Sequence, residues 1–126
     1  MVYQRWVSIH ATLDTTSIGI TKQSCMCWRS TDLLLLNLHM DITVYANVAT
    51  FGVGLDHEPP FSITTDNQVF TVPVFVVNRS TDEPRTSIGI LQADNKCHFT
   101  VERFGGFEAN TNYSITGQIF MPCSTY

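Results

Sequence analysis

The residues best suited to chemistry lie in three short segments between long apolar stretches. The first is Asp56-His57-Glu58, where two carboxylates and an imidazole precede Pro59-Pro60-Phe61. These groups hydrogen-bond to hydroxyls, and carboxylates also bind cations. The two prolines would stiffen the loop and reduce the entropy lost when a ligand binds. The alternative is a solvated turn between two strands.

The second segment, residues 78–85, gathers charge in a chain that has little of it. Its candidates for ligand contact are Arg79, Asp82 and Arg85. Arginine and aspartate make planar, directional hydrogen bonds, which suit a glycan or a phosphate-bearing cell-wall polymer. The alternative is an exposed loop that neutralises itself, in which a surface ion pair contributes less than about 1 kcal/mol.

The third segment, Phe104-Gly105-Gly106-Phe107-Glu108, places two aromatic rings around a flexible glycine pair. An exposed ring such as Phe107 can stack on the C–H face of a sugar while Glu108 holds the hydroxyls. Alternatively, these phenylalanines fold back and cap the core. Trp28 has two similar roles open to it, as a sugar platform or as packing on the end of a barrel.

Motifs of enzymatic chemistry are missing from the sequence. It contains no Gly-x-Ser-x-Gly elbow, phosphate-binding loop or His-Glu-x-x-His pair. The carboxylate pairs Asp56 with Glu58 and Asp82 with Glu83 lie in predicted loops, where nothing fixes the separation that a glycosidase needs. We therefore expect a protein that is not an enzyme and that uses no cofactor and no bound metal.

Composition excludes two classes of partner. The net charge is −4 and Lys22 and Lys96 are the only lysines, whereas nucleic-acid binding needs clustered lysine and arginine. No apolar run approaches the roughly 20 residues of a membrane span. Charged residues make up only 14% of the chain, and threonine, serine and asparagine take their place. Such a surface suits hydrogen bonding to neutral polar partners such as sugars.

Strand signals recur about every ten residues, a spacing typical of a β-sandwich or barrel, and no segment has a helical period. We therefore expect an all-β, antiparallel fold of one domain. The predicted strands are 4–11, 17–21, 24–28, 33–45, 49–55, 68–77, 86–92, 96–103 and 112–121.

Two of these strands differ in their pattern. In the strand from Leu33, alternate residues from Leu34 to Val44 are apolar, while the other face begins apolar and ends polar with His39 and Asp41. The strand 68–77 is apolar on both faces, which requires cover on both. We therefore expect a subunit interface there, with a bulge or a sheet edge at Pro73 because proline cannot donate to a ladder.

Residues 88–101 form the clearest predicted hairpin. Asp94-Asn95 would be a two-residue turn, since both residues tolerate positive φ. That turn places Ile90 opposite Phe99 and Ile88 opposite Val101.

The four cysteines match no zinc pattern. On a strand, Cys25 and Cys27 would point to the same face, so they should not bridge each other easily. We expect the cysteines to be small buried hydrophobes, with one disulfide, for example through Cys123, as the alternative.

The order of elements resembles the C-terminal head domains of bacteriophage tail-fibre and receptor-binding proteins. The similarity lies in Trp28-Arg29 with its turn and long strand, the Ile88–Val101 hairpin, and the closing Tyr113–Gly117 strand. One departure is Asp94-Asn95, where such heads often have Asn-Gly or Asp-Gly. Binding residues vary from phage to phage in that family, so none is assigned by position.

The resemblance implies a compact sandwich or jelly-roll-like barrel, a homotrimer on the virion tail, and adhesion to host cell-surface polysaccharide. Residues 24–126 would form the head, and 1–23 an added N-terminal strand or linker. The N-terminus has no signal-peptide apolar region, so we expect synthesis in the host cytoplasm and assembly with other phage tail proteins at the tail tip.

Three other functions remain open from the sequence, of which a cell-wall or glycan hydrolase is disfavoured by the missing catalytic motifs. The other two are binding proteins. One is a structural virion module, in a decoration or baseplate role, that binds only protein. The other is a small-ligand β-barrel carrier, which would need a large apolar cavity.

Overall fold

The computed structural model describes residues 3–6, 8–13, 16–30, 33–55, 69–81, 83–92 and 98–122. All regular structure in these ranges is strand, as expected for an all-β protein, and none of the described residues forms a helix that could cross a membrane. The strands are β1 (Tyr3–Trp6), β2 (Ile9–Leu13), β3 (Ile18–Arg29), β4 (Leu33–Val44), β5 (Val48–Leu55), β6 (Val69–Asn78), β7 (Glu83–Gln92), β8 (His98–Phe107) and β9 (Thr111–Pro122).

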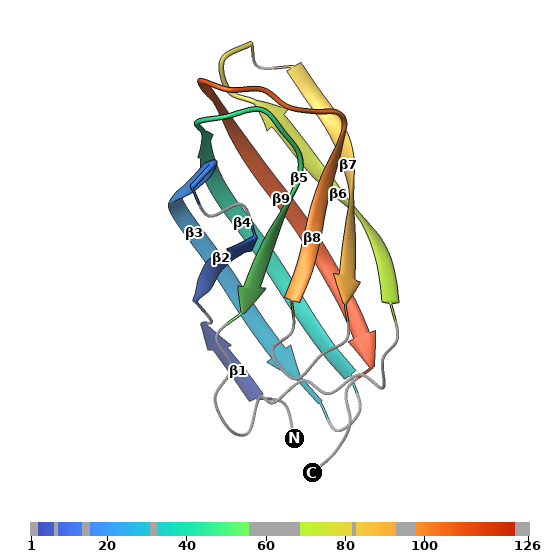
Figure 1. Ribbon diagram of the computed structural model, residues 1–126. Coiled ribbons are helices and arrows are strands. Elements are labelled where there is room, and N and C mark those ends of the chain that lie inside the picture. Colours follow the sequence, from blue (N-terminus) through green and yellow to red (C-terminus); the bar gives the residue numbers. More distant parts are fainter. Residues whose placement is uncertain are drawn as a thin grey trace.

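All nine strands belong to one antiparallel hydrogen-bonded sheet in the order β1-β3-β4-β9-β6-β7-β8-β5-β2. The sheet folds over itself, so that β1, β3, β4 and β9 form one layer, β5 and β8 lie in the other, and β6 and β7 join the two (Figure 1). The fold is therefore a β-sandwich, as predicted. β1 pairs with β3 and β2 with β5, so the N-terminal residues supply strands at both ends of the sheet order.

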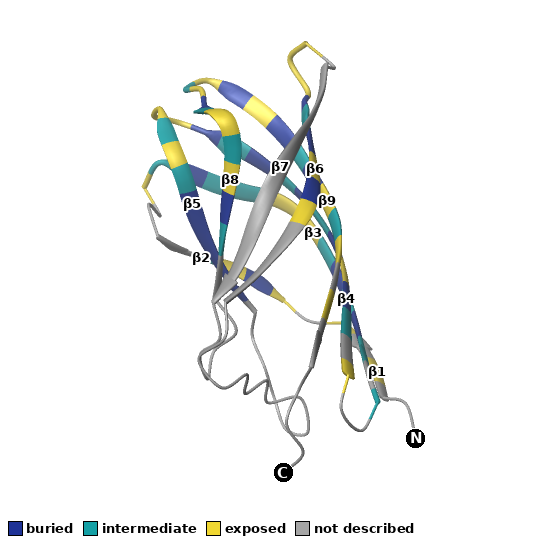
Figure 2. Cartoon of the chain, turned by 90° about the vertical axis from the view of Figure 1, so that its right-hand side faces the viewer, coloured by how far each residue is buried: buried dark blue, intermediate teal, exposed yellow. Residues whose placement is uncertain are grey.

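The core lies between the two layers, and β4 supplies much of it (Figure 2). Its predicted alternation is confirmed, because the inward residues Leu36, Leu38, Met40, Ile42 and Val44 are all buried. The opposite face is exposed or half-buried. Removing such side chains from water is the main force that holds the two layers together.

β3 is one strand of 12 residues where the sequence predicted two short ones. It pairs with β4 from Ile18↔Val44 to Arg29↔Leu34, with one irregularity between Ile20 and Lys22. Pairing with the long apolar strand β4 keeps β3 extended through a polar stretch whose own strand propensity is weak. The burial of Cys25 and Cys27 on β3 confirms that both thiols act as small hydrophobes.

The predicted register of the β7–β8 hairpin is wrong by one residue. Ile88 pairs with Glu102 and Ile90 with Thr100, while Val101 pairs with Gly89. The last pair is Gln92↔His98, so residues 93–97 connect the strands. A two-residue Asp94-Asn95 loop would require the other register. The predicted turn residues themselves lie outside the described part of the chain.

A sheet edge occurs at Pro73, as predicted. β6 pairs with β7 along its whole length, but its ladder with β9 extends only from Phe75↔Thr116 to Asn78↔Tyr113. Pro73 therefore has no partner on the β9 side, as expected for a residue that cannot donate to a ladder. The two faces of β6 also differ, since Val74 and Val76 are buried and Phe75 is exposed.

Candidate functional site

A large bulge in β8 shapes one end of the sandwich. Val48 pairs with Phe107 and Thr50 pairs with Glu102, so Ala49 alone lies opposite the stretch 103–106 of β8. Gly105 and Gly106 have φ of 86° and 78°, a backbone region that is costly for residues with a Cβ. The glycine pair thus allows β8 to bend outward and return to the ladder.

The bulge is braced from inside by Arg103. Its Nη1 donates to the Gly106 carbonyl at 2.7 Å, and its guanidinium lies 5.1 Å from the centre of the Tyr113 ring. A cation over an aromatic ring contributes about 0.5–1 kcal/mol or more. Within the described residues, the buried Nε of Arg103 has no hydrogen-bond partner. Arg103 therefore holds the shape of the bulge.

The two phenylalanines of the bulge have opposite environments. Phe107 is 2% exposed and packs edge-to-face against Phe51 and Tyr113, with ring centres 5.0 and 5.1 Å apart. Phe104 is 94% exposed. Of the two roles that the sequence left open, Phe107 has the core-capping one, and its ring has no free face for a sugar. The exposed aromatic ring of the bulge is that of Phe104.

Three hydrogen bonds fix the β8–β9 turn beside the bulge. The Glu108 N–H donates to the Tyr113 hydroxyl at 2.9 Å, and the Ala109 N–H donates to Asn47 Oδ1 at 2.7 Å. The Asn110 N–H donates to the Val44 carbonyl at 2.7 Å. Asn110 has φ of 60°, a conformation that asparagine tolerates. These bonds join the β8–β9 and β4–β5 turns into one ordered surface.

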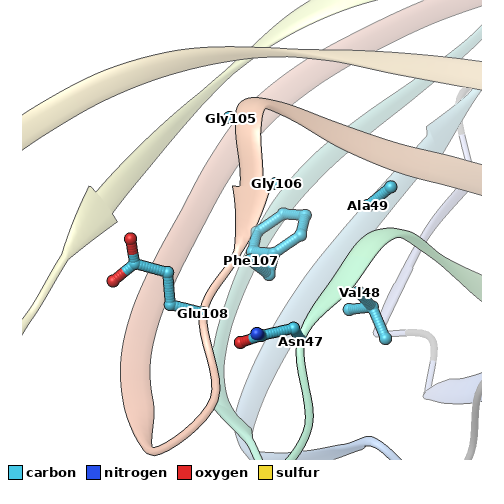
Figure 3. Close-up of a pocket in the computed structure, with 7 residues that line it drawn as sticks. All are labelled: Asn47, Val48, Ala49, Gly105, Gly106, Phe107 and Glu108. Atoms are coloured by element: carbon cyan, nitrogen blue, oxygen red, sulfur yellow. The ribbon is translucent and has the colours of Figure 1, made fainter.

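Between these turns lies an open groove of about 480 Å³, here named the β5–β8 groove. In Figure 3 the polar side chains of Asn47 and Glu108 lie to the left of those of Val48 and Ala49. A sugar ring has apolar C–H faces and a polar rim, so a groove with one polar and one apolar side matches its chemistry. The lining residues are Asn47, Val48, Ala49, Gly105, Gly106, Phe107 and Glu108.

The other predicted site residues that the structure describes do not gather at the groove. Trp28 is half-buried near the end of β3, at the opposite end of the sandwich (Figure 1). Arg79 is exposed on the turn after β6, and its N–H donates to the Asn112 carbonyl. Arg85 lies on β7 opposite Val76. The remaining candidates, Asp56, His57, Glu58 and Asp82, lie outside the described residues.

Sequence reasoning missed the residues that β5 and the turn before it contribute, Asn47, Val48 and Ala49. They reach the groove through the pairing of β5 with β8, strands that are distant in sequence. Phe104 had a usable signal, because extending the two-residue period of β8 from buried Val101 places Phe107 inside and Phe104 outside. In the described part of the chain, no group of three or more His, Cys, Asp or Glu residues is placed to hold a metal ion.

No family model and no curated protein matches this chain. The solved structures that this chain resembles in its fold include two viral proteins. One is a reovirus attachment protein, sigma1, in complex with alpha-2,3-sialyllactose, with TM-score 0.49, 13% identity, 97% of this chain covered and 67% of that one. The other is the carboxy-terminal domain of the turkey type 3 siadenovirus fibre, avirulent form, complexed with 3-sialyllactose. Its TM-score is 0.42 and its identity 9%, with 95% of this chain and 99% of that one covered.

Proposed function

We propose that this chain is the receptor-binding head of a virion attachment protein, and that it adheres to host cell-surface saccharide through the β5–β8 groove. The observation that carries the proposal is the exposure of Phe104, whose ring is almost fully in water and which directly precedes the two glycines that line the groove. Leaving such a ring in water forgoes about 1.5–3 kcal/mol of burial free energy. A binding partner that covers the ring recovers that free energy.

Adhesion at this site is non-covalent. The Phe104 ring stacks on the C–H face of a sugar, and the Glu108 carboxylate and Asn47 amide bind its hydroxyl groups. The bulge is held by Arg103 and by the β8–β9 turn, so little order has to be gained on binding. The contact is shallow and reversible.

We further propose that the head is a homotrimer on a bacteriophage tail fibre or baseplate, as the sequence resemblance implies. Three weak sites on one rigid trimer gain affinity through effective concentration. The proposed setting is the tail tip, after synthesis in the host cytoplasm, with other phage tail proteins as neighbours.

The surface that suits contact between subunits is the side of β1, β3, β4, β9 and β6 that points away from the core, here named the outer face. Four large apolar side chains on it are more than half exposed: Trp6, Leu33, Phe75 and Phe120. The registers place Leu35 between Trp28 and Phe120, which extends the apolar surface across three strands. An apolar patch of this kind usually marks an interaction site.

The polar centre of the outer face is already hydrogen-bonded. His39 Nε2 lies 3.1 Å from Asp41 Oδ1, which also accepts from the Ser114 hydroxyl at 2.6 Å. His39 Nδ1 lies 3.1 Å from Thr116 Oγ1. Polar groups that already have partners lose less when an interface excludes water. The outer face can therefore be covered without leaving these side chains unpaired.

A structural virion module that binds only protein is the second candidate, and the exposed apolar residues of the outer face favour it equally. A small-ligand carrier fits less well, because large side chains such as Phe51, Phe107 and Tyr113 fill the described space between the layers. The groove, by contrast, opens at the surface.

The test measures adsorption and mass together. The purified protein is applied to a glycan array and to host cell walls, and it is used as a competitor of virion adsorption, with Phe104→Ala as the variant. We expect saccharide binding and blocked adsorption, both weakened by the substitution, and a trimeric mass by light scattering. A protein that binds no surface polysaccharide but assembles on the particle would establish the structural module instead.

The interface is tested separately with Phe120→Asp, which places a charge in the apolar part of the outer face. We expect a lower oligomeric mass at the same protein concentration. Thr100→Asp on β8, outside the outer face, is the matched control and should keep the mass of the unaltered protein. A monomeric parent protein would refute the proposed interface.

A further inference from the structure

The charges around the groove point to one class of saccharide. We infer that the β5–β8 groove selects a neutral sugar, such as a hexose or an N-acetylhexosamine, and discriminates against sialylated and other anionic sugars. This inference rests on the proposed saccharide binding and adds the chemistry of the ligand.

The lining carries one ionisable side chain, and that side chain is negative. Glu108 is exposed at the rim of the groove. Its backbone N–H is bound to the Tyr113 hydroxyl, but its carboxylate makes no ion pair within the described residues. An unneutralised carboxylate attracts hydroxyl donors and repels a second carboxylate. The rim of the groove therefore favours ligands rich in hydroxyl groups and without negative charge.

The nearest described cation is turned away from the groove. Arg103 uses Nη1 to hold the Gly106 carbonyl, and its guanidinium lies over the Tyr113 ring. Its Nε is buried. Releasing Arg103 to bind an anionic sugar would break the brace that shapes the bulge. The Arg103 guanidinium thus stabilises the bulge and is not available to bind a ligand.

Two other cationic residues whose side-chain exposure the structure describes, Arg79 and Lys22, lie outside the lining. Arg79 is exposed on the β6–β7 turn, beyond β9 from the groove (Figure 1), and Lys22 is exposed on β3. A sugar seated between Asn47 and Glu108 has its nearest described charge at Glu108. Arg79 is the one of the two at the same end of the sandwich, so the experiment includes it as a separate variant.

The uncharged groups of the groove supply what a neutral sugar needs. Asn47 Oδ1 accepts a hydrogen bond from the Ala109 N–H. The Nδ2 group of Asn47 donates to none of the described residues. An amide donor suits a hydroxyl or an acetamido carbonyl. Glu108 accepts from hydroxyls, and Phe104 offers a ring face. Together they match a polyhydroxylated ring that carries no charge.

The experiment compares matched ligands on the full-length protein. Neutral oligosaccharides are titrated beside the same oligosaccharides capped with sialic acid, with lactose and 3′-sialyllactose as one such pair, at low and high salt. For the saccharides that bind, we expect the neutral member of each pair to bind at least about tenfold more tightly, about 1.4 kcal/mol. We expect the difference to shrink as salt screens the carboxylate.

The variant Glu108→Gln removes the charge and keeps the shape. We expect the preference for the neutral ligand to fall by roughly tenfold, while melting temperature is unchanged. Glu102→Gln, an exposed glutamate on the same strand outside the groove, is the matched control and should leave the preference intact. Arg79→Gln should also leave it intact.

Each outcome has a defined meaning. Equal or tighter binding of the sialylated ligand would overturn the neutral-sugar inference and leave saccharide binding standing. If Arg79→Gln then lost the binding of the sialylated ligand, the site for anionic sugars would lie on the β6–β7 turn. Binding of no saccharide of either kind would overturn the proposed function and this inference with it. A preference for neutral ligands that Glu108→Gln does not change would also refute the inference.

Discussion

Gly117 on β9 and Val74 on β6 are in such close contact that a Cβ added to Gly117 would lie 2.6 Å from Val74 Cγ1. The β6–β9 ladder ends one residue away, at Phe75↔Thr116. Beyond that pair β6 continues to pair with β7 but no longer with β9. Glycine is therefore required where the inward valine covers the backbone of its neighbour.

Replacing this glycine should loosen the junction between the layers. We expect Gly117→Ala to lower the free energy of unfolding by about 1–3 kcal/mol, the usual cost of forcing extra volume into a packed site. Chemical denaturation measures the change. Gln118→Ala, the exposed next residue, should cost less than about 0.5 kcal/mol. Equal stability of the two variants would show that Val74 moves aside without cost.

The two phenylalanines of the bulge should respond oppositely to the same substitution. Phe107→Ala removes a ring buried against Phe51 and Tyr113, and we expect a loss of about 3–5 kcal/mol in stability. Phe104→Ala should change stability by less than about 0.5 kcal/mol and should reduce saccharide binding. Thermal unfolding and a binding titration on both variants test the pair. An intact saccharide affinity in Phe104→Ala would remove the platform from the mechanism.

The glycines of the bulge tolerate side chains to different degrees. Both have positive φ, but a Cβ on Gly105 meets nothing within 4 Å, whereas a Cβ on Gly106 would lie 3.2 Å from the Val48 carbonyl oxygen. We expect Gly105→Asn to fold with a small loss, because asparagine adopts this conformation. Gly106→Asn should lose about 1 kcal/mol more, since the backbone of β5 blocks it. Denaturation of both variants gives the comparison, and a reversed order would contradict it.

The buried thiol of Cys25 should make the protein sensitive to alkali. Burial raises the pKa of Cys25 from 9.0 to about 12, so between these values the unfolded chain has lost a proton that the folded chain keeps. Stability contributed by the neutral thiol is therefore complete below pH 9 and is lost as pH rises toward 12. The slope is at most about 1.4 kcal/mol per pH unit.

This effect can be isolated by comparing slopes. In Cys25→Val the alkaline loss of stability should be shallower than in the parent protein. Val53→Ala, another core substitution that keeps the thiol, should retain the parent slope despite lower stability. Identical slopes for the parent protein and Cys25→Val would mean that Cys25 does not control the alkaline transition.

The alternation from Leu34 to Val44 was enough to predict which face of β4 lies in the core, because each side chain's environment follows from position along one strand. The bulge or edge predicted at Pro73 also needed only local information, because proline lacks an N–H donor in any strand. Burial of Cys25 and Cys27 on one face also followed from their spacing. These features depend on a strand and its own residues.

Register and site depended on distant segments. The β7–β8 register differs by one residue from the turn-based prediction because the whole sheet, including the β5–β8 ladder, fixes where β8 lies. The sequence indicated Glu108 and its neighbouring phenylalanines as candidates, but it did not indicate that Asn47 and Ala49 lie next to this segment. That proximity exists because strands remote in the chain pair when the sheet folds over. Local periodicity therefore determined the fold class and much of the core face, whereas only the tertiary structure, through non-local pairing, decided which residues of β5 meet the bulge of β8 and where a ligand can lie.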